Sequence, residues 1–215
     1  FEATGFSVYV IVSVTGTQAG TLPEANADEI VEVGKTISLY YNDGYSNQKW
    51  TSDNTNIATV TGSSKTGTVT GQNEGNVKIT YTWGYGILDK GEKSYNVQVY
   101  NPLVAEVKIT SAKTTNLQEG EKVDYEITLK NPNSSTVFNN VTVNITSPSE
   151  STIVDNPASV DIPANGSATI KVQCTVTAAD IQAGNNLVMK ADVTYNVAKK
   201  AATALSLQSS CITGS

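Results

Sequence analysis

The chain has 215 residues, of which 39% are hydrophobic and 16% are charged, a length that suits one large domain or two of medium size. Its formal net charge is −6, it contains no histidine, and all 14 of its basic residues are lysine. Without histidine there is no imidazole general base, no Ser-His or Cys-His nucleophile and no His-ligated zinc or haem. Without arginine, and with an acidic balance, a nucleic-acid footprint is not expected. We therefore predict a protein that is not an enzyme, with no catalytic residue, no cofactor, no metal and no nucleic-acid partner.

The chain opens on a segment of alternating apolar residues. One face of this predicted strand carries Phe6, Val8, Val10, Val12 and Val14. Its longest unbroken apolar run, Val8–Val12, is far shorter than the roughly 20 residues of a membrane-spanning helix. Residues 15–28 show no alternation, so we predict a linker there. Because the first residue is Phe1 rather than Met, we expect a processed or trimmed N-terminus from which any secretory signal peptide has been removed.

Short alternating segments separated by Gly, Asn and Pro follow along the rest of the chain, and none has a sustained helical period. In the first half, the predicted strands are 37–39, 77–81 and 95–99, with a shorter one around Val69. In the second half they are 107–109, 123–129, 141–145, 170–176 and 193–197. Since each sheet must hide one apolar face, two antiparallel β-sandwiches account for this pattern.

The predicted domain boundary lies at Asn101-Pro102, because proline cannot donate a hydrogen bond into a β-ladder. The predicted organisation is an N-terminal strand and linker over residues 1–22, a first sandwich over 23–101, a second sandwich over 102–208 and a tail over 209–215.

The first sandwich resembles the bacterial Ig-like domain, group 2. The motifs that carry the resemblance, in order, are Val33-Gly34-Lys35-Thr36, Lys49-Trp50-Thr51-Ser52-Asp53, Asn56-Ile57-Ala58-Thr59-Val60, Gly67-Thr68-Val69-Thr70-Gly71 and Glu74-Gly75-Asn76-Val77-Lys78-Ile79-Thr80. The residue types agree with such a sandwich: Trp50 suits a core aromatic, and Gly71 and Gly75 suit positions of positive φ. The resemblance implies an Ig-like fold and no particular ligand.

The second sandwich, over residues 104–197, resembles the CARDB type of Ig-like domain, a conserved repeat of prokaryotic surface proteins. The motifs that carry this resemblance are Gly120-Glu121-Lys122-Val123-Asp124-Tyr125, Leu129-Lys130-Asn131-Pro132, Val141-Thr142-Val143, Ile162-Pro163-Ala164-Asn165-Gly166 and 177–184. In the last of these, Thr177 is predicted to cap a single helical turn that Gly184 closes. The predicted fold class is therefore all-β: two tandem Ig-like antiparallel β-sandwiches with a detached N-terminal strand.

Three sets of residues are candidates for binding, cross-linking or modification. Tyr45, Trp83 and Tyr85 could form an exposed aromatic patch for a ligand such as a glycan, although packing within a hairpin explains them as well. Cys174 and Cys211 allow one disulfide, although the alternation around Cys174 favours a buried thiol. Four possible glycosylation sequons begin at Asn133, Asn140, Asn144 and Asn165; unless the source is archaeal or eukaryotic, chance explains them in a chain so rich in Asn, Ser and Thr.

The N-terminal strand has two interpretations. A strand with an apolar face must pair with a sheet, and the commoner arrangement makes it the first strand of its own domain. The alternative is donor-strand complementation, in which it completes a sheet of the next subunit and the copies grow head to tail. The long linker that follows is compatible with this second arrangement.

We therefore interpret the chain as an extracellular structural or adhesive protein of a prokaryotic cell surface, and more specifically as a repeating subunit of a filament or pilus assembled by strand addition. Its expected partners are further copies of itself, neighbouring surface-protein modules, or a glycan or host surface. Two alternatives remain: a non-catalytic accessory or spacer module of a secreted carbohydrate-active enzyme, and a phage virion protein. A hydrolase domain in the parent gene would favour the first, and neighbouring head and tail genes the second.

Overall fold

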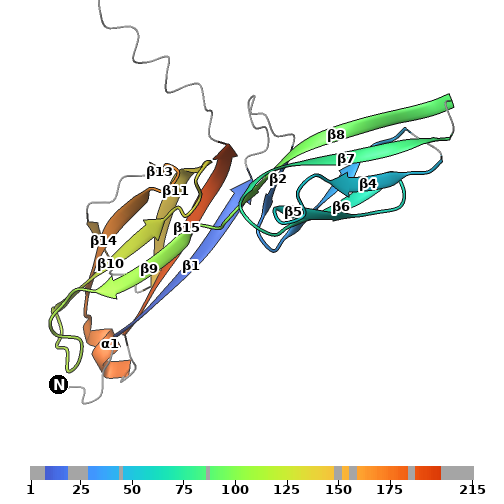
Figure 1. Ribbon diagram of the computed structural model, residues 1–215. Helices are drawn as coiled ribbons and strands as arrows, with labels where there is room; N and C mark the ends of the chain where they lie inside the picture. Colours follow the sequence, from blue (N-terminus) through green and yellow to red (C-terminus); the bar gives the residue numbers. More distant parts are fainter. Residues whose placement is uncertain are drawn as a thin grey trace, which may run out of the picture. The chain divides into compact units, whose positions relative to one another are not determined.

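The computed structural model describes residues 8–18, 29–43, 46–85, 88–147, 152–154, 159–183 and 187–199 (Figure 1). The chain divides into two compact domains. We call the first the inserted domain, which lies within Gly20–Pro102. We call the second the discontinuous domain, because it combines a segment within Phe1–Ala19 with Leu103–Ala198. Both are built from β-sheets, which confirms the predicted all-β class.

The inserted domain contains a four-stranded and a three-stranded sheet. The first has the order β2 (Glu29–Glu32), β8 (Leu88–Tyr100), β7 (Gly75–Tyr85), β4 (Lys49–Ser52). The second has the order β3 (Thr36–Tyr40), β6 (Thr66–Gly71), β5 (Ala58–Thr61). Neighbouring strands are antiparallel, except that β2 runs parallel to β8.

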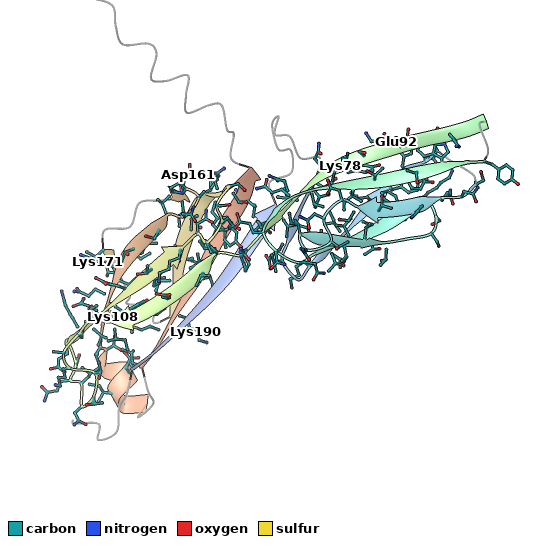
Figure 2. All side chains as sticks on the ribbon, viewed as in Figure 1. Lys78, Glu92, Lys108, Asp161, Lys171 and Lys190 are labelled. Carbon is teal, nitrogen blue, oxygen red and sulfur yellow. The ribbon has the colours of Figure 1, made fainter. Side chains whose placement is uncertain are left out.

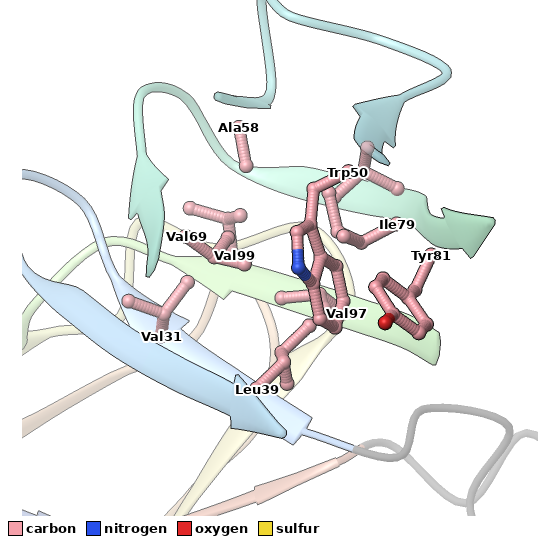
Figure 3. Packing of buried hydrophobic residues seen from close by; sticks show 10 residues of the cluster. Val31, Leu39, Trp50, Ala58, Val69, Ile79, Tyr81, Val97 and Val99 are labelled. Atoms are coloured by element: carbon pink, nitrogen blue, oxygen red, sulfur yellow. The ribbon is translucent and has the colours of Figure 1, made fainter. Parts of the chain in front are cut away.

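Trp50 fills the core of the inserted domain, as predicted. Its side chain is 6% exposed, and its ring centroid lies 4.7 Å from that of Tyr81. Figure 3 shows the indole between the two sheets, close to Leu39. The indole N–H donates a 2.8 Å hydrogen bond to the Ser64 carbonyl oxygen, so its polar atom is satisfied. Gly67 makes room for the ring, because a Cβ there would lie 2.5 Å from Trp50 Cδ2.

The two glycines that were predicted to need positive φ differ from each other. Gly75 has φ +150°, which confirms the prediction for that residue. Gly71 does not adopt positive φ; it is required instead for close packing. A Cβ at Gly71 would lie 2.8 Å from the Glu32 carbonyl oxygen and 3.0 Å from Val99 Cγ1.

The discontinuous domain contains two four-stranded sheets. One has the order β1 (Val8–Gln18), β15 (Leu187–Lys199), β11 (Thr136–Ser147), β13 (Val160–Ile162). The other has the order β12 (Thr152–Val154), β14 (Ser167–Thr175), β10 (Lys122–Lys130), β9 (Val104–Ile109). The N-terminal strand β1 is therefore part of a sheet and is not detached from the sandwiches. It belongs to the second predicted sandwich, whereas the sequence placed it beside the first.

Alternation along β10 separates the core from the surface of the discontinuous domain. Its inward residues, from Val123 to Leu129, are buried at every second position. On the outer face, Glu126 lies between Lys108 of β9 and Lys171 of β14 in the strand register. Figure 2 labels these two lysines on the strands that flank β10. Opposite charges placed side by side support the pairing of exposed strands.

Two polar motifs fix the connections of this domain. Buried Asn131 donates hydrogen bonds from Nδ2 to the carbonyl oxygens of Thr136, Ile162 and Pro163, so it ties the β10–β11 loop to the end of β13. At α1 (Ala178–Ala183), the Thr177 hydroxyl accepts a hydrogen bond from the Asp180 N–H, and the Asp180 carboxylate accepts one from the Thr177 N–H. This reciprocal cap confirms the predicted role of Thr177. Gly184 lies outside the described residues.

Candidate functional site

The strand β1 forms an extended ladder with β15. The two strands run parallel over eleven residues, from Val8 opposite Leu187 to Gln18 opposite Val197. β1 is the outermost strand of its sheet. Parallel pairing between the first and the last strand of a sandwich is also present in the inserted domain, where β2 pairs with β8.

The apolar alternation of β1 is in phase with the burial of β15. Val8, Val10, Val12 and Val14 lie opposite Leu187, Met189, Ala191 and Val193. All four of these β15 residues are buried, with exposures of 2% or less. The register therefore agrees with the predicted apolar face of the N-terminal strand. Phe6, the remaining member of that predicted face, lies outside the described residues.

The buried β15 residues that lie opposite β1 are the part of the site that the sequence did not predict. The alternation of residues 193–197 predicted a strand there, but neither the extension of this strand to Leu187 nor its pairing with β1 was predicted. The signal was present, because Leu187, Met189 and Ala191 alternate with exposed Lys190 and Asp192. Parallel pairing between residues so far apart in sequence leaves no local signature such as a turn.

The chain leaves and re-enters the discontinuous domain at the same end of β15. Gln18, the last residue of β1, lies opposite Val197. Leu103, where the chain returns, donates its backbone N–H to the Tyr195 hydroxyl oxygen at 3.3 Å. Every other strand of this domain is contained in the continuous segment Leu103–Ala198, apart from the last residue of β15. β1 alone reaches its sheet through the inserted domain.

β8, the last strand of the inserted domain, is paired by β2 over a much shorter stretch than β15 is paired by β1. β2 pairs with β8 only from Val97 to Tyr100. Among the described strands, β7 is the only neighbour of β8 between Leu88 and Asn96. Lys93 lies opposite buried Tyr81 in this stretch, so the register gives it a core-side position, but it is exposed and its Nζ lies 5.3 Å from the Tyr95 ring centroid. A lysine on the inner side of an edge strand opposes the addition of another strand.

The predicted aromatic patch is not assembled as a platform by the described residues. Trp83 packs against the core, with its ring centroid 5.3 Å from that of Tyr41 and 5.4 Å from that of Tyr81. It also covers Gly91, its partner across the β7–β8 hairpin: a Cβ there would lie 2.1 Å from Trp83 Cζ2. Aromatic cover of a cross-strand glycine stabilises a hairpin.

Tyr85 is the exposed member of the patch, and its side chain is 76% exposed. A shallow hollow of about 460 Å³ beside Trp83 is lined by Asn47, Thr82, Trp83, Gly84, Lys90, Gly91 and Glu92. Tyr45 lies outside the described residues. The ligand role of these aromatics stays a prediction, and their described contacts are those of hairpin packing.

The four sequons differ in accessibility. Asn133 is 0% exposed, and its Nδ2 donates a 2.8 Å hydrogen bond to Asn131 Oδ1, so this side chain cannot carry a glycan in the folded domain. Asn140, Asn144 and Asn165 are exposed. Modification of these three stays a prediction.

Cys174 is a fully buried residue of β14, opposite Val123 of β10, and its thiol lies 3.8 Å from the Thr175 carbonyl oxygen. This position agrees with the interpretation of Cys174 as a small core residue. Cys211, its predicted disulfide partner, lies outside the described residues, so the disulfide stays a prediction.

Two described ionisable groups have displaced pKa values, and both displacements have structural causes. A hydrogen bond from Lys113 Nζ, at 2.7 Å, and one from the Gln118 N–H lower the pKa of Glu121. Burial, with a smaller contribution from Cys174, raises the pKa of Tyr125 to about 12. Within the described residues, no cluster of acidic or cysteine side chains is arranged to hold a metal ion.

Comparison with known proteins gives one family match, which lies within the inserted domain. Residues 25–90 match the family model of the bacterial Ig-like domain (group 2), which confirms the resemblance predicted for this part of the chain. The resemblance of residues 104–197 to CARDB-type domains stays a prediction. No curated protein matches the chain.

Among solved structures, the chain is similar to the S-layer protein rSbsC, with 18% sequence identity and a TM-score of 0.26. The match covers 71% of this chain and 20% of that one, so our chain spans about a fifth of its length. A TM-score this low establishes no shared architecture for the chain as a whole. In the described part of our chain, no helix has the length and apolarity needed to cross a bilayer.

Proposed function

We propose that this chain is an extracellular, non-catalytic structural protein of a prokaryotic cell surface, and that it is a repeating subunit of a filament or pilus whose copies are joined by strand addition. The family match of residues 25–90 supports a surface setting, because bacterial Ig-like domains of this group are modules of surface proteins. The lack of histidine and arginine supports a role that depends on folding and contact rather than on catalysis.

The observation that carries the proposal is the path of β1. This strand completes the edge of the discontinuous domain over eleven residues, yet only the inserted domain connects it to the rest of that sheet. Strand addition uses main-chain hydrogen bonds for affinity and alternate side chains for specificity. β1 supplies both features, because it has a long register and an apolar residue at every second position from Val8 to Val14.

Electron microscopy of the undenatured full chain, with denaturing gels of unheated samples, tests this proposal. We expect regular filaments and ladders that resist SDS. Deletion of residues 1–14 is expected to abolish both, while the inserted domain stays folded. The two tryptophans of the chain, Trp50 and Trp83, both lie in the inserted domain, so their fluorescence reports its folding separately.

A uniform monomer at all concentrations would contradict the proposal. So would loss of the native tryptophan spectrum in the deletion variant, because β1 would then be required for the inserted domain. An exposed-site variant, Tyr85→Ala, serves as the control, since it leaves β1 intact and alters a side chain that is 76% exposed.

A further inference from the structure

We infer that the edge of β15 is a strand-exchange site whose partner is β1 of a second copy of this chain, and that the β1–β15 pair within one chain is the closed form of the same site. This inference rests on the proposed function. It adds that β15 is the acceptor strand, that the register is the one described, and that the closed form is the one that does not assemble.

β1 is separable from the other strands of its domain, because only the inserted domain connects it to them. Strands β9 to β14 and nearly all of β15 lie on one continuous segment, and no turn within the domain joins β1 to any of them. Removal of β1 would leave both sheets connected, and it would uncover the backbone edge of β15 together with the part of β9 that lies close to β1. The described pairing therefore imposes no requirement that β1 come from the same chain.

The edge of β15 is suited to a partner strand. The residues opposite β1 form a buried apolar row that runs from Leu187 to Val197. No charged residue interrupts this row, because Lys190 and Asp192 occupy the exposed positions between its members. The edge of β8 differs, since Lys93 has a core-side position there. Of these two edges, β15 is the one that favours strand addition.

Both connections between the discontinuous and the inserted domain begin at the same end of β15. Gln18 lies opposite Val197, and the Leu103 N–H donates a hydrogen bond to the Tyr195 hydroxyl oxygen. The ten residues 19–28 that follow β1 reach at most about 35 Å when extended. A β1 strand from any copy whose inserted domain lies near this end can therefore enter the same register.

Concentration then decides between the two forms. A tethered strand has an effective concentration on the order of millimolar, so the closed form prevails in dilute solution. Exchange is expected when copies are crowded or fold together. One-way exchange extends a chain of copies, whereas reciprocal exchange closes a dimer.

Disulfide trapping between separately labelled copies tests the inference. Ser13 lies opposite Asp192 in the ladder, and Asp192 is exposed. One preparation carries Ser13→Cys and the other carries Asp192→Cys, both with Cys211→Ser so that the tail thiol does not react. The two are mixed at high concentration, unfolded, refolded together, oxidised and separated on non-reducing gels. The matched control replaces Asp192→Cys with Thr169→Cys, an exposed residue of β14 in the other sheet.

We expect at least tenfold more covalent dimer from the Ser13/Asp192 mixture than from the Ser13/Thr169 control. We also expect that a chain with both Ser13→Cys and Asp192→Cys, when oxidised in dilute solution, is locked as a monomer and assembles only after reduction. A dimer yield no higher than the control would overturn the inference.

Electron microscopy of the same mixtures separates this inference from the proposed function. Filaments without a specific covalent dimer would overturn strand exchange but leave a filament subunit. A specific dimer without filaments would support exchange, in its reciprocal form, and overturn the filament. Monomers in every mixture would overturn both.

Discussion

Val12 of β1 lies opposite Ala191 of β15, next to the central pair of the parallel ladder that completes the discontinuous domain. Ala191 is 1% exposed, so this register position belongs to the core. The pair joins a strand before the inserted domain to a strand far beyond it. The N-terminal strand therefore stabilises the discontinuous domain, most of which lies beyond the inserted domain in the sequence.

A charge at this register position should disrupt the ladder. We expect Val12→Asp to destabilise the discontinuous domain by roughly 3 kcal/mol, because it places an unpaired carboxylate against a buried position. Ile11→Asp is the control: Ile11 lies opposite exposed Lys190, and we expect a change of less than about 1 kcal/mol. Thermal unfolding by far-UV circular dichroism measures both. Equal effects of the two variants would show that the register is not the one described.

Trp83 and Tyr85 should differ in their contribution to stability. Trp83→Ala removes the ring that covers Gly91 and contacts Tyr41, so we expect the inserted domain to lose about 2 kcal/mol. Tyr85→Ala should change it by no more than about 0.5 kcal/mol, because that side chain is 76% exposed. Urea unfolding followed through Trp50 fluorescence tests both. An unchanged midpoint for Trp83→Ala would favour a ligand role for this residue over packing.

Gly67→Ala should destabilise the inserted domain despite the better strand propensity of alanine. The new Cβ would lie 2.5 Å from Trp50 Cδ2, so the indole or the strand must move, at a cost of about 1–3 kcal/mol. Thr68→Ala, at the exposed neighbouring position, is the control and should have little effect. A variant as stable as the parent chain would mean that the core around Trp50 is looser than described.

Tyr125 and Tyr195 should respond in opposite ways to removal of their hydroxyl groups. Among the described residues the Tyr125 hydroxyl has no hydrogen-bond partner, so Tyr125→Phe should leave the discontinuous domain as stable as before, or more stable by up to about 1 kcal/mol. The Tyr195 hydroxyl accepts the Leu103 N–H, so Tyr195→Phe should cost about 1–3 kcal/mol. Thermal unfolding at neutral pH compares them, and a marked loss for Tyr125→Phe would indicate a buried partner such as water.

The raised pKa of Tyr125 should also make the stability of the discontinuous domain depend on pH. Its pKa is about 12 in the folded chain, against 10.0 ordinarily. Between these values the unfolded chain releases this proton and the folded chain retains it, so stability should fall as pH rises from about 10 to 12. Tyr125→Phe should flatten this decline in denaturant titrations. An identical decline in the variant would assign it to other groups.

The fold class followed from the sequence because period-two alternation is a local signal. Residues 123–129 alternate between apolar and polar types, and the structure buries them at every second position. Trp50 could be assigned to the core for a similar reason, since a large aromatic within a β-pattern is rarely solvated. The capping role of Thr177 also depends only on residues close in sequence.

The pairing of β1 could not be predicted in the same way. Alternation shows which residues of a strand share a face, but it does not identify the partner strand or the direction of pairing. Gly71 illustrates a second limit, because its requirement for a small residue comes from Glu32 and Val99, which are distant in sequence. The burial of Asn133 is a third, since the sequon has the same letters whether or not the side chain is enclosed.

Peptide complementation tests most directly whether β1 is a separable strand of the discontinuous domain. The chain lacking residues 1–18 is titrated with a synthetic peptide of residues 1–18, and its thermal midpoint is followed by circular dichroism, with a Val12→Asp peptide as the control. We expect the native peptide to raise the midpoint in a saturable way and the control peptide to leave it unchanged. A midpoint that the native peptide leaves unchanged, or that both peptides raise equally, would show that β1 is not a separable strand of this domain in the described register.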